Sequence, residues 1–198
     1  MTRTDIINYL IKRYNYKSYL EIGVNTSAQP GYNWVGVESE TKHGVDPNVD
    51  TTFKVPSDEF FENHVSQMYD IVFVDGLHIF EQAYRDITNS LDILNEGGTI
   101  VVHDCNPTEE ITQRRERASD AWHGDVWKAI LKLRIERQDL SIFTVDADEG
   151  CCVIRKGSQE LFPHCLDQDI YQYKFLDDNR KEALNLIDPW DVQRELSK

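Results

Sequence analysis

The sequence predicts an α/β fold, with helices packed on both faces of a mostly parallel β-sheet. Short apolar runs typical of buried strands alternate along the chain with segments of helical periodicity. Two of these runs, at residues 69–75 and 99–104, each end in an acidic residue. The helical stripe between them is long enough for a right-handed crossover, so we expect both strands to end at the same edge of the sheet.

Composition limits the class of protein. The chain has 198 residues, 40% of them hydrophobic, and a formal net charge of −14. We expect a single domain over residues 1–198, with its core at about 18–156. No apolar run reaches the roughly 18 residues of a membrane span, and the first residues lack a signal peptide's apolar stretch. We therefore expect a cytoplasmic protein without a membrane partner, and the negative charge argues against a nucleic-acid partner.

The four cysteines indicate neither a disulfide scaffold nor a zinc site. Cys105, Cys151, Cys152 and Cys165 show no CxxC spacing. Cys151 and Cys152 are neighbours on an expected strand, where alternation sends their side chains to opposite faces. We expect reduced thiols.

The chain begins with a predicted helix and strand. Residues 4–14 place apolar side chains on one helical face, with Thr4 as the expected N-cap. A β-prone run at 18–24 then enters a polar turn. That turn is the first candidate ligand contact.

Two further extended segments precede the next helix. One covers 42–47 and ends in Asp46, and residues 51–55 are predicted to form a third strand. Ser57 is expected to cap the helix that follows.

The C-terminal half continues the alternation. Apolar residues recur at helical spacing over 80–94, and a second helix is predicted at about 125–137. Segments 141–146 and 150–155 are separated by a short link and should pair as an antiparallel hairpin. The tail at 165–198 is apolar enough to pack back on the core as a helix.

Polar residues at the strand ends are the first candidates for ligand binding, because ligands of open α/β sheets bind beyond the carboxyl ends of the strands. Glu21 and Gly23 end the first strand, where the glycine lets the backbone approach a ligand. Asp46 ends the second strand, where a carboxylate can accept both hydroxyls of a ribose. Ser57 and Asp58 follow the third strand and can contact the edge of an adenine.

Five motifs occur in a characteristic order: YLEIGV at 19–24, GVDP at 44–47, SDEFF at 57–61, VDGLH at 74–78 and VVHDC at 101–105. Together they resemble the class I S-adenosylmethionine-dependent methyltransferases of the Methyltransf_24 type. The resemblance covers roughly residues 18–156. It implies a three-layer Rossmann-like fold with a mostly parallel seven-stranded sheet and a C-terminal antiparallel hairpin, and S-adenosylmethionine as the cofactor.

The resemblance also implies which residues surround the cofactor: Glu21, Gly23, Asn25, Asp46, Ser57, Asp58 and Asp75. The glycine-rich first loop of the family is reduced here to Gly23. Polar groups of Asn25, Thr26 and Ser27 are therefore expected to hold the cofactor's carboxylate.

The second strand has two interpretations. If residues 34–38 form it, Glu38 would accept the ribose hydroxyls instead of Asp46. We prefer Asp46, because the residues around it match the family better.

Methyl transfer to a hydroxyl needs an aligned acceptor and a base that removes its proton. His78 and His103 are the candidate bases, and Asp75 or Asp104 would orient them. We prefer His78, which lies beyond a strand end; for His103 a structural role in the interior is the alternative.

In related O-methyltransferases acids at these strand ends hold a divalent ion, a role that Asp75 and Asp104 would take. Cys105 stands where an oxygen ligand is usual, so metal dependence is not favoured.

Residues after the last parallel strand are candidates for acceptor binding. Arg114, Arg115 and Arg117 form a basic cluster that would suit a carboxylate or phosphate, although such runs are usually solvated. Trp122 and Trp127 would form a wall or lid, with Trp127 alternatively part of the core. The leading hypothesis is O-methylation of a small polar metabolite, such as a sugar.

Other functions stay open at this point. A nicotinamide-dependent oxidoreductase would need a GxGxxG turn after the first strand, which the sequence lacks. A non-catalytic module that binds an adenosyl ligand is the second alternative. Tyr171, Tyr173 and Phe175 would pack either on the core or in a homodimer.

Overall fold

The computed structural model describes residues 1–25, 32–163 and 169–197. The strands are β1 (Ser18–Ile22), β2 (Thr41–Val45), β3 (Tyr69–Val74), β4 (Leu94–Val102), β5 (Leu140–Val145), β6 (Cys151–Lys156) and β7 (Leu186–Ile187). The helices are α1 (Arg3–Tyr14), α2 (Asn33–Gly36), α3 (Ser57–Asn63), α4 (Phe80–Asp92), α5 (Trp127–Glu136), α6 (Tyr173–Ala183), the 3₁₀ helix η1 (Pro189–Asp191) and α7 (Val192–Glu195).

The strands form one seven-stranded sheet in the order β2-β1-β3-β4-β6-β5-β7. β6 runs antiparallel to both of its neighbours, and the other pairs are parallel. The predicted mostly parallel sheet with an antiparallel hairpin is therefore confirmed. Parallel pairing brings the carboxyl ends of β1 to β4 to one edge.

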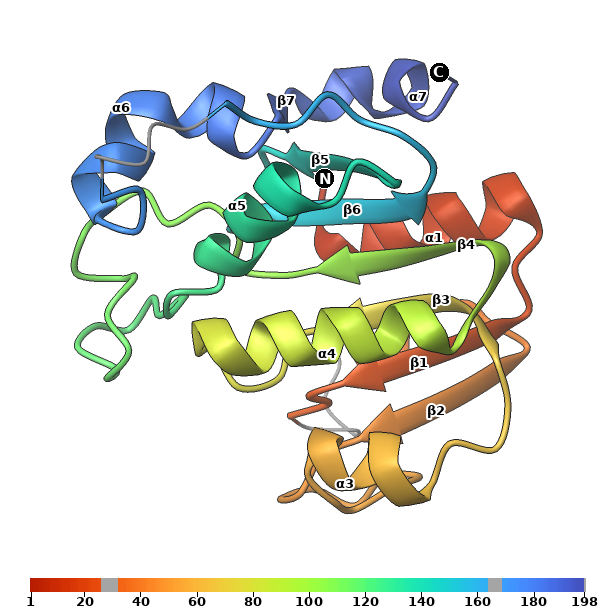
Figure 1. Ribbon diagram of the computed structural model, residues 1–198. Coiled ribbons are helices and arrows are strands. Elements are labelled where there is room, and N and C mark those ends of the chain that lie inside the picture. The colour runs from red at the N-terminus through yellow and green to blue at the C-terminus, as the bar shows by residue number, and fades with distance from the viewer. Residues whose placement is uncertain (26–31, 164–168, 198) are drawn as a thin grey trace.

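Helices cover both faces of the sheet (Figure 1). Alternate residues of each strand point to opposite faces. Leu20 and Val72 belong to a core cluster with α3, α4, α5 and α6, whereas Tyr19 and Ile71 pack with α1 and α7. The helix expected at 4–14 is α1, which extends the second cluster through its buried isoleucines and leucine.

Two strand predictions are corrected. The segment at 51–55 forms only an isolated bridge between Phe53 and Val45. It stops there because the Asp46 carboxylate accepts hydrogen bonds from the backbone of the following turn, and this turn directs the chain away from β2. The seventh strand is instead β7, from the tail expected to be helical; it pairs with β5 between α6 and η1.

Local details of the helices also differ from expectation. The N-cap of α1 is Thr2 rather than Thr4, because Thr2 and Asp5 bond reciprocally in a capping box. Ser57 is the first residue of α3 and does not cap it. The stretch 34–38 is not a strand, since α2 occupies most of it.

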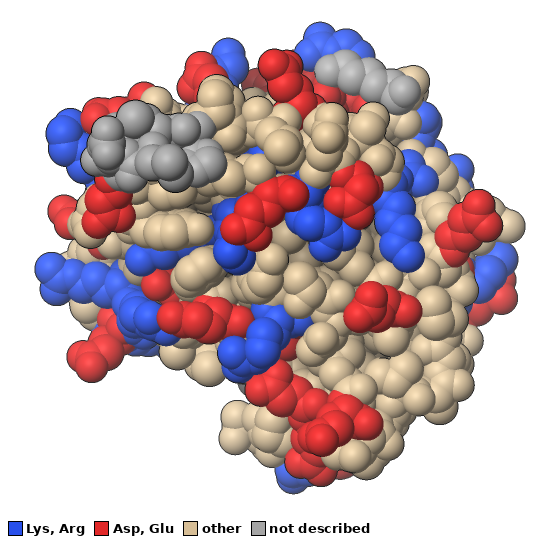
Figure 2. All heavy atoms as spheres, in the orientation of Figure 1, with Lys and Arg blue, Asp and Glu red and all other residues tan. Residues whose placement is uncertain are grey.

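The described surface is mixed in charge. Figure 2 shows acidic and basic side chains interspersed on the face that carries α4 and α5. None of the described helices combines the length and the apolar character that crossing a bilayer requires. Cys105, Cys151 and Cys152 are buried free thiols, and Cys165 lies outside the described residues.

Helix α4 buries a carboxylate on its core side. Asp86 is only 1% exposed. Its Oδ1 accepts a hydrogen bond from Gln82 Nε2 at 3.0 Å. Burial raises the pKa of Asp86 from 3.8 to about 6, the charge of Asp58 adds to the shift, and hydrogen bonds from Gln82 and Ser57 partly oppose it.

We expect Asp86→Asn to stabilise the protein at pH 8 and to change little at pH 4. The folded state favours the protonated carboxyl, so the free energy of unfolding falls as the pH rises above the unfolded pKa and levels off above the folded value of about 6. Asparagine stays neutral, so the variant should have a free energy of unfolding up to about 3 kcal/mol higher at pH 8. This value follows from about 1.4 kcal/mol per pKa unit. Urea unfolding at both pH values measures this, with exposed Asp92→Asn as the control on the same helix. An equal effect at both pH values would contradict the assignment.

Candidate active site

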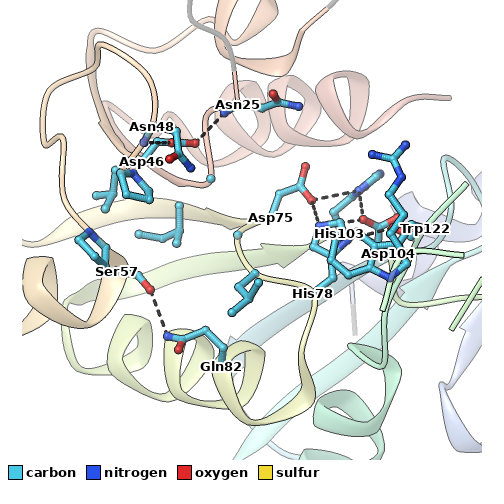
Figure 3. Close-up of a pocket in the computed structure, with 18 of the residues that line it drawn as sticks. Asn25, Asp46, Asn48, Ser57, Asp75, His78, Gln82, His103, Asp104 and Trp122 are labelled. Carbon is cyan, nitrogen blue, oxygen red and sulfur yellow. Dashed lines mark hydrogen bonds and ion pairs between the residues drawn. The ribbon is translucent and has the colours of Figure 1, made fainter. Parts of the chain in front are cut away.

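A cleft of about 750 Å³ lies at the carboxyl ends of β1 to β4. Six of the seven residues predicted to surround a cofactor line it: Gly23, Asn25, Asp46, Ser57, Asp58 and Asp75. All three predicted catalytic residues, His78, His103 and Asp104, line it as well. Figure 3 shows two groups, one around Asp46 and one around Asp75.

Asp46 is held by backbone amides. Its Oδ2 accepts a hydrogen bond from Asn25 N at 3.0 Å, and its Oδ1 accepts from Asn48 N at 2.8 Å (Figure 3). The carboxylate therefore connects the loop after β1 to the turn after β2. Thr26 and Ser27, also predicted at this loop, lie outside the described residues. Glu38, the alternative to Asp46, is exposed and does not line the cleft.

Gln82 connects α4 to the start of α3 at the same end of the cleft. Its Nε2 donates to Ser57 Oγ at 3.1 Å (Figure 3). It also donates to Asp58 Oδ1 at 2.9 Å. The sequence analysis did not select Gln82, since nothing in a helical stripe marks one polar residue as facing a cleft. These side chains supply donors and acceptors suited to a planar heterocycle.

Gly23 lines the cleft where the ends of β1 and β3 pack closely together. Its φ of +87° is in the left-handed region, and a Cβ added there would lie 2.1 Å from the carbonyl oxygen of Asp75. Only glycine fits between the ends of β1 and β3. The resulting cradle fits the cofactor that the resemblance implies.

The structure does not place Glu21 in the cleft. Its side chain is 2% exposed and accepts hydrogen bonds from the Tyr19 hydroxyl at 2.6 Å and from Asn33 Nδ2 at 3.3 Å. Burial raises the pKa of Glu21 to about 8, and the charge of Asp75 adds to the shift. The strand alternation that sends Tyr19 toward α1 also sends Glu21 there.

His78 contacts both aspartates of the second group. Its Nε2 lies 3.2 Å from Asp75 Oδ1 and 3.3 Å from Asp104 Oδ2. Its Nδ1 donates to the Trp122 carbonyl oxygen at 3.0 Å, and the two rings stack with their centroids 4.9 Å apart. Burial alone would lower the pKa of His78, but the hydrogen bond that it donates to Asp75 and the charges of Asp104 and Asp75 raise the pKa above its ordinary value. Losing the Nε2 proton leaves the tautomer whose lone pair faces the cleft.

His103 is more deeply buried yet also lines the cleft. Its Nδ1 lies 3.2 Å from Asp104 Oδ2 and 3.4 Å from Asp75 Oδ1. Its Nε2 lies 2.8 Å from Arg3 Nη1 and 3.6 Å from Asp148 Oδ1. Burial acts to lower the pKa of His103, but the three carboxylates outweigh it and raise the pKa well above its ordinary value.

The same contacts stabilise the ionised form of Asp75. Burial would raise the pKa of Asp75, but hydrogen bonds and positive charge from His103 and His78 hold it well below its ordinary value. The two imidazoles thus neutralise the two carboxylates that β3 and β4 bring together.

Asp104 has a strained backbone. Its φ is 58°, which a non-glycine residue adopts at a cost of about 1–3 kcal/mol. Backbone bonds from Cys105 N to Gly150 O, at 3.0 Å, and from Asn106 N to Glu149 O, at 2.9 Å, hold the turn. The Cys105 thiol points to the carbonyls before it and stays in the core.

A third histidine approaches the cluster, and the sequence analysis missed it. His123 is 2% exposed, with Nε2 2.6 Å from Glu149 Oε2 and 4.0 Å from Asp104 Oδ1. Glu149 comes from the β5–β6 turn. No sequence motif connects this turn to the strand ends, because only the tertiary fold brings them together.

Of the residues predicted to bind the acceptor, some line the cleft and others do not. Trp122 lines the cleft, as does Arg117. Trp127 is fully buried in the core and does not line it. Arg115 is paired with Glu81 on the surface, and Arg114 is exposed; neither lines the cleft.

Three of these side chains also have the spacing of a metal site. Asp75, His78 and Asp104 each offer one ligand atom, and these atoms lie within 4.8 Å of one another. Two carboxylates and an imidazole fit a divalent transition ion better than magnesium, which prefers oxygen ligands. Cys105 is turned away and would not complete the set.

Comparison with known families agrees with this geometry. Residues 13–105 match Methyltransf_24, a family described as a methyltransferase domain. The matched segment contains β1 to β4 and the ends of those strands that line the cleft. The resemblance inferred from the sequence is thereby confirmed. No curated protein is significantly similar to the chain in sequence.

Solved structures share the fold of this methyltransferase domain at low sequence identity. The O-methyltransferase from Bacillus cereus in complex with SAH is 14% identical over 78% of this chain and 80% of that chain, with a TM-score of 0.56. SAH-bound PaMTH1 from Podospora anserina is 15% identical over 79% and 78% of the two chains, with a TM-score of 0.55. TomG from Streptomyces achromogenes in complex with SAM is 14% identical over 79% and 80%, with a TM-score of 0.53.

We expect Gly124→Ala to destabilise this methyltransferase domain by at least about 2 kcal/mol. Gly124 has a φ of +58°, and an added Cβ would lie 1.8 Å from the His78 carbonyl oxygen. Gly97→Ala is the control: its φ of +75° is also left-handed, but an added Cβ meets nothing within 4 Å. Gly97→Ala should therefore cost only about 1 kcal/mol. Equal losses in chemical denaturation would show that the contact with His78 is unimportant.

Proposed function

We propose that this protein transfers a methyl group from S-adenosylmethionine to a hydroxyl of a small-molecule acceptor. The observation that carries the proposal is the convergence of Asp75, His78 and Asp104 in the cleft whose other end holds Asp46. The family match and the SAM- or SAH-bound structures with this fold support the cofactor. A sugar is one class of acceptor with suitable hydroxyls.

The two ends of the cleft serve different parts of the cofactor. Asp46 would accept the ribose hydroxyls with the oxygen lone pairs that its backbone donors leave free. Ser57, Asp58 and Gln82 would contact the adenine. The Gly23 turn, which lines the cleft between the ends of β1 and β3, would contact the methionine portion.

His78 would deprotonate the acceptor. S-adenosylmethionine supplies the methyl group as an electrophilic sulfonium carbon. The Trp122 carbonyl holds the proton on Nδ1, so the neutral imidazole presents Nε2 to the acceptor hydroxyl. Asp75 and Asp104 then stabilise the imidazolium that forms. A divalent ion held by Asp75, His78 and Asp104 would instead polarise that hydroxyl.

Calorimetric titration tests the cofactor directly. We expect micromolar binding of S-adenosylmethionine and S-adenosylhomocysteine and none of NAD, because the first turn lacks the glycine pattern that seats a pyrophosphate. The titrations are run with magnesium and with EDTA, and we expect equal affinities. Methyl-transfer activity is measured under the same two conditions and is also expected to be equal. Preference for NAD would refute the proposal, and loss of activity in EDTA would favour the metal-assisted mechanism.

His78→Ala should lower kcat by about 100- to 10,000-fold, the usual contribution of a general base. Binding of S-adenosylhomocysteine should change little, because His78 lies at the other end of the cleft from Asp46 (Figure 3). His64→Ala, at the exposed end of α3, is the control and should keep full activity. Activity is measured against the hydroxyl compound that a screen identifies. A variant as active as the wild type would exclude His78 as the base.

A further inference from the structure

Arg3, in the first turn of α1, reaches the cleft from a part of the chain far from the methyltransferase motifs. Its backbone N donates to Asp148 Oδ2 at 2.6 Å, and its Nη1 lies 2.8 Å from His103 Nε2. The side chain is 26% exposed. Both its backbone and its side chain are therefore fixed beside the cluster at Asp75.

The guanidinium keeps most of its hydrogen-bonding capacity. Among the described residues only its Nη1 lies close to a side-chain polar atom, His103 Nε2, and the nearest carboxylate oxygen, Asp148 Oδ1, is 3.8 Å away. Arg137 shows the contrast, since its Nε and Nη2 each donate to one oxygen of Asp139 at 2.7 Å. A half-buried guanidinium without such a forked partner is suited to bind a planar carboxylate from a ligand.

The charges around Arg3 allow an anion to approach. Asp75 and Asp104 are both contacted by His78 and His103, so an incoming carboxylate meets partnered acids. A remaining acid on the cleft lining, Asp120, is exposed, and water screens it. Asp148, the acid beside Arg3, is also partnered, because its carboxylate contacts the Arg3 backbone N and His103.

We propose that Arg3 binds a carboxylate group at the reaction end of the cleft. The proposal rests on the proposed function. Two sources share this chemistry: the methionine carboxylate of the cofactor and an acid group on the acceptor. Binding by Arg3 would orient the ligand relative to His78 and make the enzyme selective for acids.

The first arm of the test compares two adenosyl ligands by calorimetry. S-adenosylhomocysteine has a carboxylate, and 5′-deoxy-5′-methylthioadenosine lacks one. If the cofactor is the source of the carboxylate, Arg3→Gln weakens the binding of S-adenosylhomocysteine by about tenfold or more. The binding of 5′-deoxy-5′-methylthioadenosine stays unchanged. Arg3→Lys keeps the positive charge but loses the forked pair of donors, so its affinity for S-adenosylhomocysteine should be intermediate. Arg13→Gln, in the last turn of the same helix, removes the same charge and is the control.

The second arm tests the acceptor. With S-adenosylhomocysteine saturating, 3,4-dihydroxybenzoate and 3,4-dihydroxybenzamide are titrated into wild type and Arg3→Gln. A preference for the acid that disappears in the variant assigns the carboxylate to the acceptor.

Failure of this inference differs from failure of the proposed function. A folded Arg3→Gln that binds S-adenosylhomocysteine as tightly as wild type, with no Arg3-dependent preference for the acid, overturns the role of Arg3 alone. Thermal unfolding verifies the fold. Wild type that binds neither adenosyl ligand contradicts the proposed function itself.

Discussion

The structure around the cleft depends on one constraint: two carboxylates meet at the same edge of the sheet. Parallel pairing of β3 and β4 brings Asp75 and Asp104 there, and His103 N donates to Val74 O where the strands end. Two ionised acids with little water between them repel each other. His78 and His103 each contact both, at 3.2 to 3.4 Å, and this removes the repulsion. Proton binding and local folding are therefore coupled at this point.

The histidines in turn take partners from distant elements. Asp148 and Glu149 in the β5–β6 turn have φ values of 47° and 63°, and each contacts a histidine of the cluster, His103 and His123 respectively. Asp104 itself is left-handed. Such residues persist only where surrounding contacts hold them, and they concentrate at functional sites. Asp148 and Glu149 are the two central residues of a hairpin turn closed by a bond from Gly150 N to Ala147 O at 3.0 Å, a turn type that requires positive φ at both positions. The turn thereby presents two acids to the strand ends.

Sequence reasoning succeeded where a side chain's place follows from its own strand. Asp75 and Asp104 were predictable because a parallel crossover fixes where both strands end, and His78 follows within one turn. The positions of Arg3 and Asp148 were not predictable, because their convergence depends on how α1 and the hairpin pack. Glu21 was assigned to the cleft although its alternation with Tyr19 directs it toward α1. The strand expected at 51–55 failed because β-propensity does not reveal that the turn after Asp46 leaves this segment with a single bridge to the end of β2.

The cleft fixes its acids in two different ways, and the difference matches the two tasks proposed for them. Asp46 is held by backbone amides, which do not titrate, so its position does not depend on the protonation of a neighbouring side chain. Asp75 is held by imidazoles, so proton movement changes its surroundings. Burial raises the pKa of Glu21, which disfavours a further negative charge behind Asp75. The electrostatics of the reaction end are therefore controlled by the two histidines, the groups whose charge a proton transfer would change.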